Sequence, residues 1–216
     1  MSEWLPPRQF SEADGIDDWR VLANGASAHF TTDAFATGVA LADAVGALAD
    51  AAGRYPDVDL RATGVTVRLT ADPDHGLSRL DLELARQISA AAGALGAPAD
   101  PAAVQEVQVS IDALSIPAVR AFWRAVLGYR EVGEEDLLDP RGHGPSFWFQ
   151  DMDEPRPQRN RVHVDVFVPH DQAEARVAAA IAAGGRLVTD EHAPSWWTLA
   201  DPEGNEVDVA SWAGRD

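Results

Sequence analysis

Cysteine is absent from the sequence of 216 residues. Its absence excludes disulfide bonds, thiolate metal ligands and a cysteine nucleophile, and it fits a cytoplasmic protein. The sequence also lacks any apolar run that approaches the roughly 20 residues of a membrane-spanning helix. Its first residues show no basic segment followed by an apolar one, which is the pattern of a secretory signal. We therefore expect a cytoplasmic protein that does not enter a membrane.

Positive charge is scarce as well. Arginine and lysine together number 17, against 35 aspartate and glutamate residues, which gives a formal net charge of −18. Because binding to a phosphate backbone depends on basic side chains that release counterions, this composition argues against a nucleic-acid partner. The same reasoning disfavours acidic membrane surfaces. The simplest role of the charge is to keep the protein soluble.

One stretch breaks every regular spacing in the chain. Proline and alanine dominate residues 97–104, and this composition is typical of a linker between domains. The chain is long enough for two domains of about 100 residues each. We therefore predict an N-terminal domain over residues 1–96 and a C-terminal domain over residues 105–216, both of the α+β class.

The N-terminal half alternates between strand and helix patterns. After an extended or turn-rich lead-in, the predicted elements are a hairpin of strands at 19–22 and 26–30, a helix at 34–52, a strand at 64–70 and a helix from 78 to about 95. Thr32 or Asp33 is expected to cap the first helix. Ser78 with Asp81 three residues later resembles a capping box for the second.

The C-terminal half repeats one order of elements, a strand, a helix and about three strands. The first unit comprises a strand at 107–112, a helix at 116–127 and strands at 129–132 and 146–150. The second comprises a strand that starts at 162, a helix at 171–183 and strands at 186–189, 196–199 and 206–210. Such self-similarity marks a duplicated architecture.

Strict alternation distinguishes the strand over residues 160–168. Its valines at positions 162, 164, 166 and 168 fall on one face, which predicts contact with the core. His163, Asp165 and Phe167 fall on the other face. That second face therefore presents an imidazole, a carboxylate and an aromatic ring, and it is the candidate floor of a site.

The stretches FWRAVLGYREV, NRVHVDVFV and LADPEGNEVDV are similar to the vicinal oxygen chelate superfamily, in its glyoxalase-like branch, over residues 105–213. The resemblance implies paired βαβββ modules that form a cup around a site. In metal-dependent members, four side chains of the cup hold one divalent ion. Placed on this chain, the implied metal ligands are Gln108, Gln150, His163 and Asp208. In its strand, each of the four alternates with the apolar residues that are expected to face the core. This alternation supports the placement independently.

The resemblance also implies a reaction class. With a divalent metal bound, the family mechanism stabilises an enolate or related oxyanion, and a carboxylate shuttles the proton. Asp208 or Asp165 is the candidate catalytic base. However, the family usually has a glutamate in place of Gln150 and often one in place of Asp208, and amides are poor metal ligands. A metal-free polar cup therefore stays open as an alternative.

Aromatic residues near the predicted cup indicate a small-molecule pocket. Trp148 shares a strand face with Gln150, and Trp197 lies just before the turn of sequence DPEGN. Asp112 adds a carboxylate on the first strand of the domain. Aromatic side chains with a few polar groups are typical of small-molecule sites. We therefore expect Trp148, Trp197 and Asp112 to line the substrate pocket, although the tryptophans would equally fill core or a dimer contact.

The stretches DDWRVL, GVTVRLT and GLSRLDLELARQI resemble pterin-4a-carbinolamine dehydratase over residues 16–94. The family's site has His-His-Pro, where this chain has Arg54-Tyr55-Pro56. A further family histidine follows a threonine, where this chain has Thr70-Ala71-Asp72. Loss of water from a 4a-hydroxypterin needs groups that exchange protons near neutral pH, as histidine does and arginine does not. We therefore predict a degenerate domain with little or no dehydratase activity.

Three functional hypotheses follow. The first is a glyoxalase-like, metal-dependent lyase, isomerase or dioxygenase that acts on a small organic molecule. The second is a non-catalytic small-molecule-binding protein whose N-terminal domain mediates dimerisation. The third is a 4a-hydroxytetrahydropterin dehydratase with an altered site. Both families commonly self-associate, so the resemblance implies a homodimer.

Overall fold

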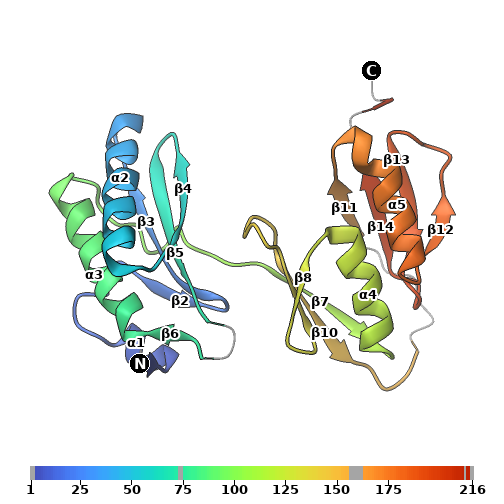
Figure 1. Ribbon diagram of the computed structural model, residues 1–216, viewed down its shortest axis with the longest axis horizontal. Coiled ribbons are helices and arrows are strands. Elements are labelled where there is room, and N and C mark those ends of the chain that lie inside the picture. The colour runs from blue at the N-terminus through green and yellow to red at the C-terminus, as the bar shows by residue number, and fades with distance from the viewer. Residues whose placement is uncertain (1–2, 73–74, 156–162, 212, 215–216) are drawn as a thin grey trace. The chain divides into compact units, whose positions relative to one another are not determined.

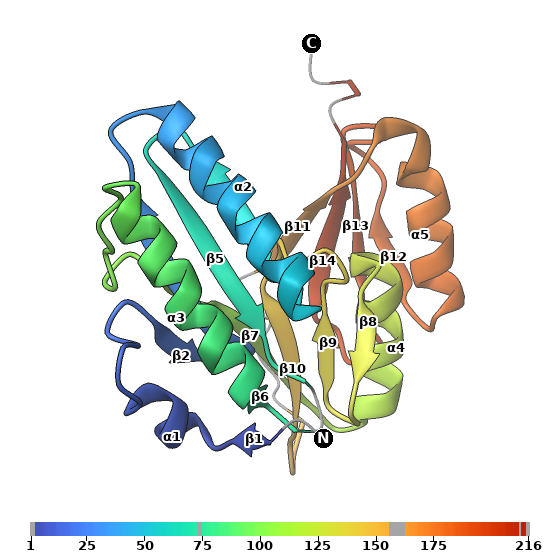
Figure 2. The ribbon, with the colours of Figure 1, turned by 60° about the vertical axis from the view of Figure 1, so that its left-hand side comes forward.

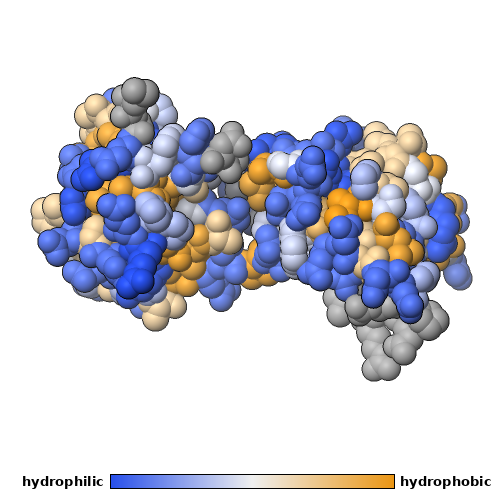
Figure 3. Space-filling view, turned by 90° about the horizontal axis from the view of Figure 1, so that it is seen from below, coloured by the Kyte–Doolittle hydropathy of each residue, from blue (hydrophilic) through white to orange (hydrophobic). Residues whose placement is uncertain are grey.

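The computed structural model describes residues 3–72, 75–155, 163–211 and 213–214 (Figure 1). The chain divides into two compact units, Met1–Glu106 and Val107–Asp216. Each unit combines helices with a β-sheet, as predicted for the α+β class. Hydrophilic residues dominate the face seen in Figure 3, in line with the large excess of acidic side chains.

The N-terminal unit is a four-stranded antiparallel sheet with two long helices against it. Its elements are β1 (Trp4–Leu5), α1 (Pro7–Ser11), β2 (Arg20–Leu22), β3 (Gly25–Thr31), α2 (Phe35–Ala52), β4 (Asp57–Arg61), β5 (Gly64–Thr70), β6 (Leu77–Ser78) and α3 (Arg79–Ala94). The main sheet has the order β2-β3-β5-β4, and β1 pairs with β6. Helices α2 and α3 lie side by side on the sheet in both ribbon views (Figure 2).

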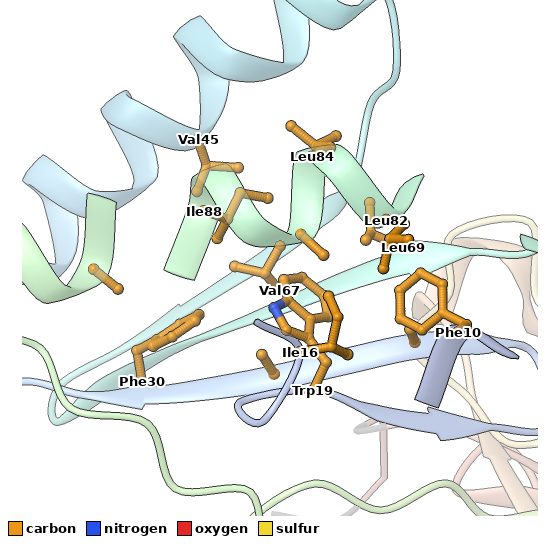
Figure 4. Close-up of a cluster of buried hydrophobic side chains, with 14 of the residues drawn as sticks. Phe10, Ile16, Trp19, Phe30, Val45, Val67, Leu69, Leu82, Leu84 and Ile88 are labelled. Carbon is orange, nitrogen blue, oxygen red and sulfur yellow. The ribbon is translucent and has the colours of Figure 1, made fainter. Parts of the chain in front are cut away.

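The hydrophobic core of this unit follows from the spacing of apolar side chains along its strands and helices. Val65, Val67 and Leu69 alternate along β5 and are buried, because successive side chains of a strand point to opposite faces. On α3, Leu84 and Ile88 lie one turn apart and are buried against the sheet. All five side chains belong to one hydrophobic cluster with Phe10, Trp19 and Phe30. Figure 4 labels four of them, Val67, Leu69, Leu84 and Ile88.

Several local predictions for this unit are confirmed. The hairpin pairs Leu22 with Gly25, and α2 ends at Gly53 in the left-handed conformation with φ 63°. The capping box of α3 is complete, because Ser78 accepts from the Asp81 backbone and Asp81 accepts from the Ser78 backbone. These motifs act over a few residues, so the sequence alone identifies them.

Other local predictions are wrong. The N-cap of α2 is Ala34 without a side-chain cap, because the helix begins beyond both Thr32 and Asp33. The predicted lead-in contains β1 and α1, which starts at a proline, a residue suited to the first turn of a helix. Strand β4 was not predicted because its sequence, DVDLR, places charges on an edge strand.

Helix α2 is, within the described residues, long and apolar enough by length and composition to cross a membrane. Its 18 residues have a mean hydropathy of 1.4. Leu41, Val45 and Ala49 of this helix are buried in the core of the N-terminal unit. One face of the helix therefore packs on the core, and length and composition alone are weak evidence for a membrane span.

Part of the predicted linker packs on the N-terminal unit. Thr31 donates its backbone N–H to the Pro98 carbonyl over 2.9 Å, and the Asp100 N–H donates to the His29 carbonyl over 2.8 Å. Phe30 and Ala99 form an antiparallel bridge. The segment therefore extends the edge of the sheet beside β3, although its composition is that of a linker.

The C-terminal unit contains two four-stranded sheets of identical order. Its elements are β7 (Gln108–Ala113), α4 (Ile116–Leu127), β8 (Arg130–Val132), β9 (Asp136–Leu138), β10 (Ser146–Asp151), β11 (Val164–Phe167), the short 3-10 helix η1 (His170–Gln172), α5 (Ala173–Ala182), β12 (Arg186–Thr189), β13 (Trp196–Ala200) and β14 (Glu206–Ala210). The orders are β7-β10-β9-β8 and β11-β14-β13-β12, with the first pair parallel in each. The predicted pair of βαβββ modules is confirmed.

Both modules share one hydrophobic core. Phe122 and Trp123 of α4 are buried with Val177 of α5 and with alternate residues of the sheets. Gly185 follows α5 where the chain passes the Phe122 ring, and a Cβ at this position would lie 2.2 Å from that ring. Only glycine permits this close approach.

The element boundaries in this unit differ modestly from the predictions. Strand β9 was not predicted, and the helix expected at 171–183 consists of η1 followed by α5. The expected start of β11, Val162, lies outside the described residues. Val164, Val166 and Val168 pack against the core, which confirms the predicted core face of β11.

Candidate functional site

The outward face of β11 is polar and accessible. The side chains of His163 and Asp165 are 52% and 48% exposed, and Phe167 is also exposed. This face opposes the buried valines because the side-chain period of a strand is two. The predicted polar floor therefore exists, and it is open to solvent.

Strand pairing adds a second carboxylate to this face. In the parallel ladder of β11 and β14, Asp165 lies directly beside Asp208. The His163 Nε2 atom lies 3.2 Å from Asp165 Oδ1 and 3.8 Å from Asp208 Oδ2. One ligand atom from each of the three residues falls within 4.8 Å of the other two. We call these three residues the His-Asp-Asp cluster.

The charges of this cluster favour a cation. Like charges directly opposite on neighbouring strands repel each other, and Asp208 is the more buried carboxylate, with its side chain 17% exposed. A protonated imidazole or a bound cation between the two carboxylates relieves that repulsion. The sequence placed Asp165 near the site as a base, and the strand register places it beside the proposed ligand Asp208.

The donor set of the cluster fits a divalent transition metal. Ligand atoms at about 2.1 Å from a tetrahedral ion lie about 3.4 Å apart, which is close to the separations that His163 makes with Asp165 and Asp208. An imidazole with carboxylates suits zinc, iron and manganese. The three residues of the cluster therefore fit such an ion after small side-chain rotations.

The two predicted glutamine ligands lie on the other module. Gln108 is exposed, and its Nε2 donates to Ser146 Oγ over 3.3 Å. Gln150 is exposed at the end of β10 and pairs with Asp112 of β7. Each glutamine lies beside a polar residue of the neighbouring strand of its own module, and the role of both as metal ligands stays a prediction.

The three predicted pocket residues have different surroundings. Trp148 is partly buried, and its Nε1 donates to Glu135 Oε2 over 3.0 Å. Asp112 is partly buried beside Gln150. Trp197 pairs with Val209 and packs against the hydrophobic core, so its ring lies on the core side of β13.

Two polar residues beside these positions had no sequence signal. Thr198 lies opposite Asp208 in the ladder of β13 and β14. Asp136 lies opposite Trp148 on β9, where burial and the neighbouring Glu135 carboxylate raise the pKa of Asp136. Because β9 was not predicted, Asp136 could not be placed on the sheet from the sequence.

The turn of sequence DPEGN has a structural role. Asp201 is fully buried, and its carboxylate accepts from Trp123 Nε1, from Asn205 Nδ2 and from the backbones of Glu203 and Asn205, over 2.7 to 3.0 Å. Glu203 accepts the N–H groups of Leu114 and Ser115 at the start of α4, over 2.8 and 2.7 Å. The conspicuous motif therefore joins the two modules and holds the residues that lead into α4, while the polar cluster follows it on β14.

In the N-terminal unit, the positions that the resemblance compares with the dehydratase site include an ion pair. The Arg54 guanidinium donates to the carboxylate of the buried Asp81 and to the Thr70 carbonyl. Tyr55 is 71% exposed. Arginine stays protonated at neutral pH, so Arg54 neutralises a buried carboxylate and does not exchange protons there.

Comparisons with known proteins agree with both resemblances. The family model described as Pterin 4 alpha carbinolamine dehydratase matches residues 5–91, and that described as Glyoxalase-like domain matches residues 108–210. No curated protein matches this chain.

The chain is also similar to solved structures. A glyoxalase/bleomycin resistance protein/dioxygenase family enzyme from Burkholderia phytofirmans PsJN is 20% identical, over 48% of this chain and 95% of that chain, with a TM-score of 0.40. A transcriptional coactivator/pterin dehydratase from Brucella melitensis is 22% identical, over 42% of this chain and 100% of that chain, with a TM-score of 0.39. The fosfomycin resistance protein FosX from Mesorhizobium loti is 8% identical, over 50% and 89% of the two chains, with a TM-score of 0.39.

Both families predicted from the sequence are confirmed by the family models, and the matched ranges fall within the two compact units. The residues that carry the resemblances, Trp123 with Asp201 in one unit and Ser78 with Asp81 in the other, hold the folds together. The chain therefore joins an N-terminal pterin dehydratase-like domain to a C-terminal glyoxalase-like domain.

Proposed function

We propose that the glyoxalase-like domain is a metal-dependent enzyme, a lyase, isomerase or dioxygenase, that acts on a small organic molecule. The observation that carries the proposal is the His-Asp-Asp cluster, in which three ligand atoms from β11 and β14 lie within 4.8 Å of one another. The surrounding face bears further polar groups, among them Thr198 opposite Asp208. A few convergent polar groups on an open sheet face suit a small substrate.

The solvent exposure of each residue in the cluster indicates its role. His163 and Asp208 would hold the ion, and Asp165 would complete the set through one carboxylate oxygen. When bound, the ion supplies Lewis-acid stabilisation of an oxyanion. Asp165 is more exposed than Asp208, so its second oxygen is better placed to accept a proton from a bound molecule.

Metal content tests this proposal. The full chain, purified without a histidine tag or chelator, is analysed for bound elements and titrated with Mn²⁺, Fe²⁺, Co²⁺, Ni²⁺ and Zn²⁺. We expect close to one ion per chain for at least one of these metals. The absence of binding for all five would retire the metal-dependent reactions and leave the alternative, a non-catalytic domain that binds a small molecule on the same face.

For the N-terminal domain we propose the loss of dehydratase activity. Arg54 is committed to Asp81 and the Thr70 carbonyl, and the positions of the family histidines hold no imidazole. The full chain should therefore not accelerate the loss of water from a 4a-hydroxytetrahydropterin above the uncatalysed rate. An authentic dehydratase serves as the control, and comparable turnover by this chain would overturn the proposal in favour of an altered but active site.

We also propose that the N-terminal domain joins two copies of the chain through α2. Phe35 and Val39 lie one helical turn apart and are 55% and 46% exposed. Apolar side chains grouped on a helix face are stabilised when a second copy covers them. Sedimentation equilibrium should give a dimer for the full chain and a monomer for Phe35→Asp, and a monomeric wild type at tens of micromolar would contradict this arrangement.

A further inference from the structure

The N-terminal unit contains a cavity of about 360 Å³. Its walls come from three segments, the chain from β1 into α1, the hairpin of β2 and β3, and the turn between β5 and β6. Of the positions compared with the dehydratase site, Ala71 lines the cavity, whereas Arg54 and Tyr55 do not. A cavity of this size falls within the range of about 300–1,000 Å³ that is typical of small-molecule sites.

The walls of this cavity are fixed by backbone contacts. Ala71 donates its N–H to the Asn24 carbonyl over 2.9 Å, which ties the turn to the hairpin. Asp72 and Gly76 exchange two backbone hydrogen bonds of 2.9 and 2.8 Å, and Leu5 pairs with Leu77. A site whose walls are joined in this way needs little reorganisation to accept a ligand.

The side chains that line the cavity are apolar, apart from the imidazole of His75 and the indole N–H of Trp4. Leu5, Leu22, Ala71 and Leu77 contribute aliphatic surface, and Trp4 contributes an indole ring. His75 is stacked on Trp4, with ring centroids 4.7 Å apart and an interplanar angle of 14°. The stacking fixes the plane of the imidazole at the wall of the cavity.

The hydrogen bond of His75 determines what this imidazole offers a ligand. His75 Nδ1 lies 2.9 Å from Asp72 Oδ1. An ionised carboxylate only accepts hydrogen bonds, so Nδ1 carries the proton. In the neutral ring Nε2 is then an acceptor. The cavity therefore combines apolar walls with an acceptor suited to one N–H or O–H group.

We propose that this cavity binds a neutral, fused-ring aromatic molecule with a single N–H or O–H group that donates to His75 Nε2. The size and the apolar walls suit two fused rings. A ring system edged with several polar groups, as a pterin is, would leave those groups without partners. The Asp72 carboxylate and the net charge of −18 disfavour an anion.

Indole and 1-methylindole are the matched probes, since they differ only in the N–H group. Isothermal titration of the full chain should show indole binding with a submillimolar Kd. Binding of 1-methylindole should be weaker by about fivefold or more, which corresponds to one hydrogen bond. His75→Phe keeps an aromatic ring against Trp4 and should abolish the difference between the probes, while Ala71→Phe should fill the cavity and prevent binding of both.

His192→Phe is the matched control, because His192 is stacked on Trp196 in the C-terminal unit, with ring centroids 4.2 Å apart. Its affinity for both probes should equal that of the wild type. The proposal is overturned if indole does not bind, if Ala71→Phe binds it normally, or if His75→Phe still prefers indole. Circular dichroism checks folding, and if Ala71→Phe does not fold, the probe preference of His75→Phe decides alone.

Discussion

Replacing Asp201 with alanine is expected to lower the free energy of unfolding of the glyoxalase-like domain by about 3 kcal/mol or more. The carboxylate is fully buried and accepts four hydrogen bonds. Alanine would leave the buried Trp123 N–H without its acceptor. It would also release the turn whose Glu203 holds Leu114 and Ser115, just before α4, so the two modules would lose a shared contact.

Urea unfolding followed by tryptophan fluorescence measures this loss. Asp190→Ala is the control, since Asp190 is an exposed aspartate of the same domain, and its replacement should change the free energy by less than about 0.5 kcal/mol. Trp123→Phe should give a smaller loss than Asp201→Ala, because it removes only one of the four donors. A loss below about 1 kcal/mol for Asp201→Ala would mean that the turn does not join the modules energetically.

Metal affinity should depend on the His-Asp-Asp cluster much more than on the predicted glutamine ligands. We expect His163→Ala and Asp165→Asn each to weaken binding of the preferred metal by at least about 100-fold. The loss of an outer-shell partner already costs up to about 100-fold, and these two residues are proposed to contact the ion directly. Asp165→Asn keeps the size of the side chain and removes the charge. The expectation rests on the pairing of Asp165 with Asp208 and on the 3.2 Å approach of His163 to Asp165.

Gln150→Ala is the matched comparison in the same titration. Gln150 lies on the outward face of the equivalent sheet of the first module, beside Asp112. We expect its replacement to change metal affinity by less than about 10-fold. An equal loss for Gln150→Ala and Asp165→Asn would instead restore the four-residue set that the family resemblance implies, with donors from both modules.

Features that depend on neighbouring residues were predictable from the sequence. The capping box of Ser78 and Asp81, the left-handed Gly53 and the alternation of β11 all act within a few residues. The duplicated order of elements was predictable for the same reason, since each module repeats its local patterns.

Strand register was not predictable in this way. Asp165 and Asp208 lie 43 positions apart, and only the ladder of β11 and β14 makes them neighbours. The same holds for Thr198, which reaches this face through the pairing of β13 with β14. For Trp197 the register has the opposite effect. Its pairing with Val209 directs the ring, which was predicted to line the pocket, toward the core.

In this chain, the residues of the most recognisable motifs are not the proposed functional residues. The turn of sequence DPEGN identifies the fold because Asp201 and Glu203 hold it together. In the N-terminal domain, Arg54 lies where the resemblance implies a histidine, and it forms an ion pair with Asp81. The residues that carry the family resemblances therefore stabilise the fold of this chain. The proposed functional side chains lie beside them.

Pulsed electron paramagnetic resonance on the full chain loaded with Mn²⁺ tests the central claim most directly. If His163 binds the ion, electron spin echo envelope modulation will show coupling to an imidazole nitrogen, at one Mn²⁺ per chain. The coupling should disappear in His163→Ala and persist in His170→Ala, a control histidine of the same domain. Mn²⁺ bound without nitrogen coupling, or coupling that survives His163→Ala, would contradict the proposed site.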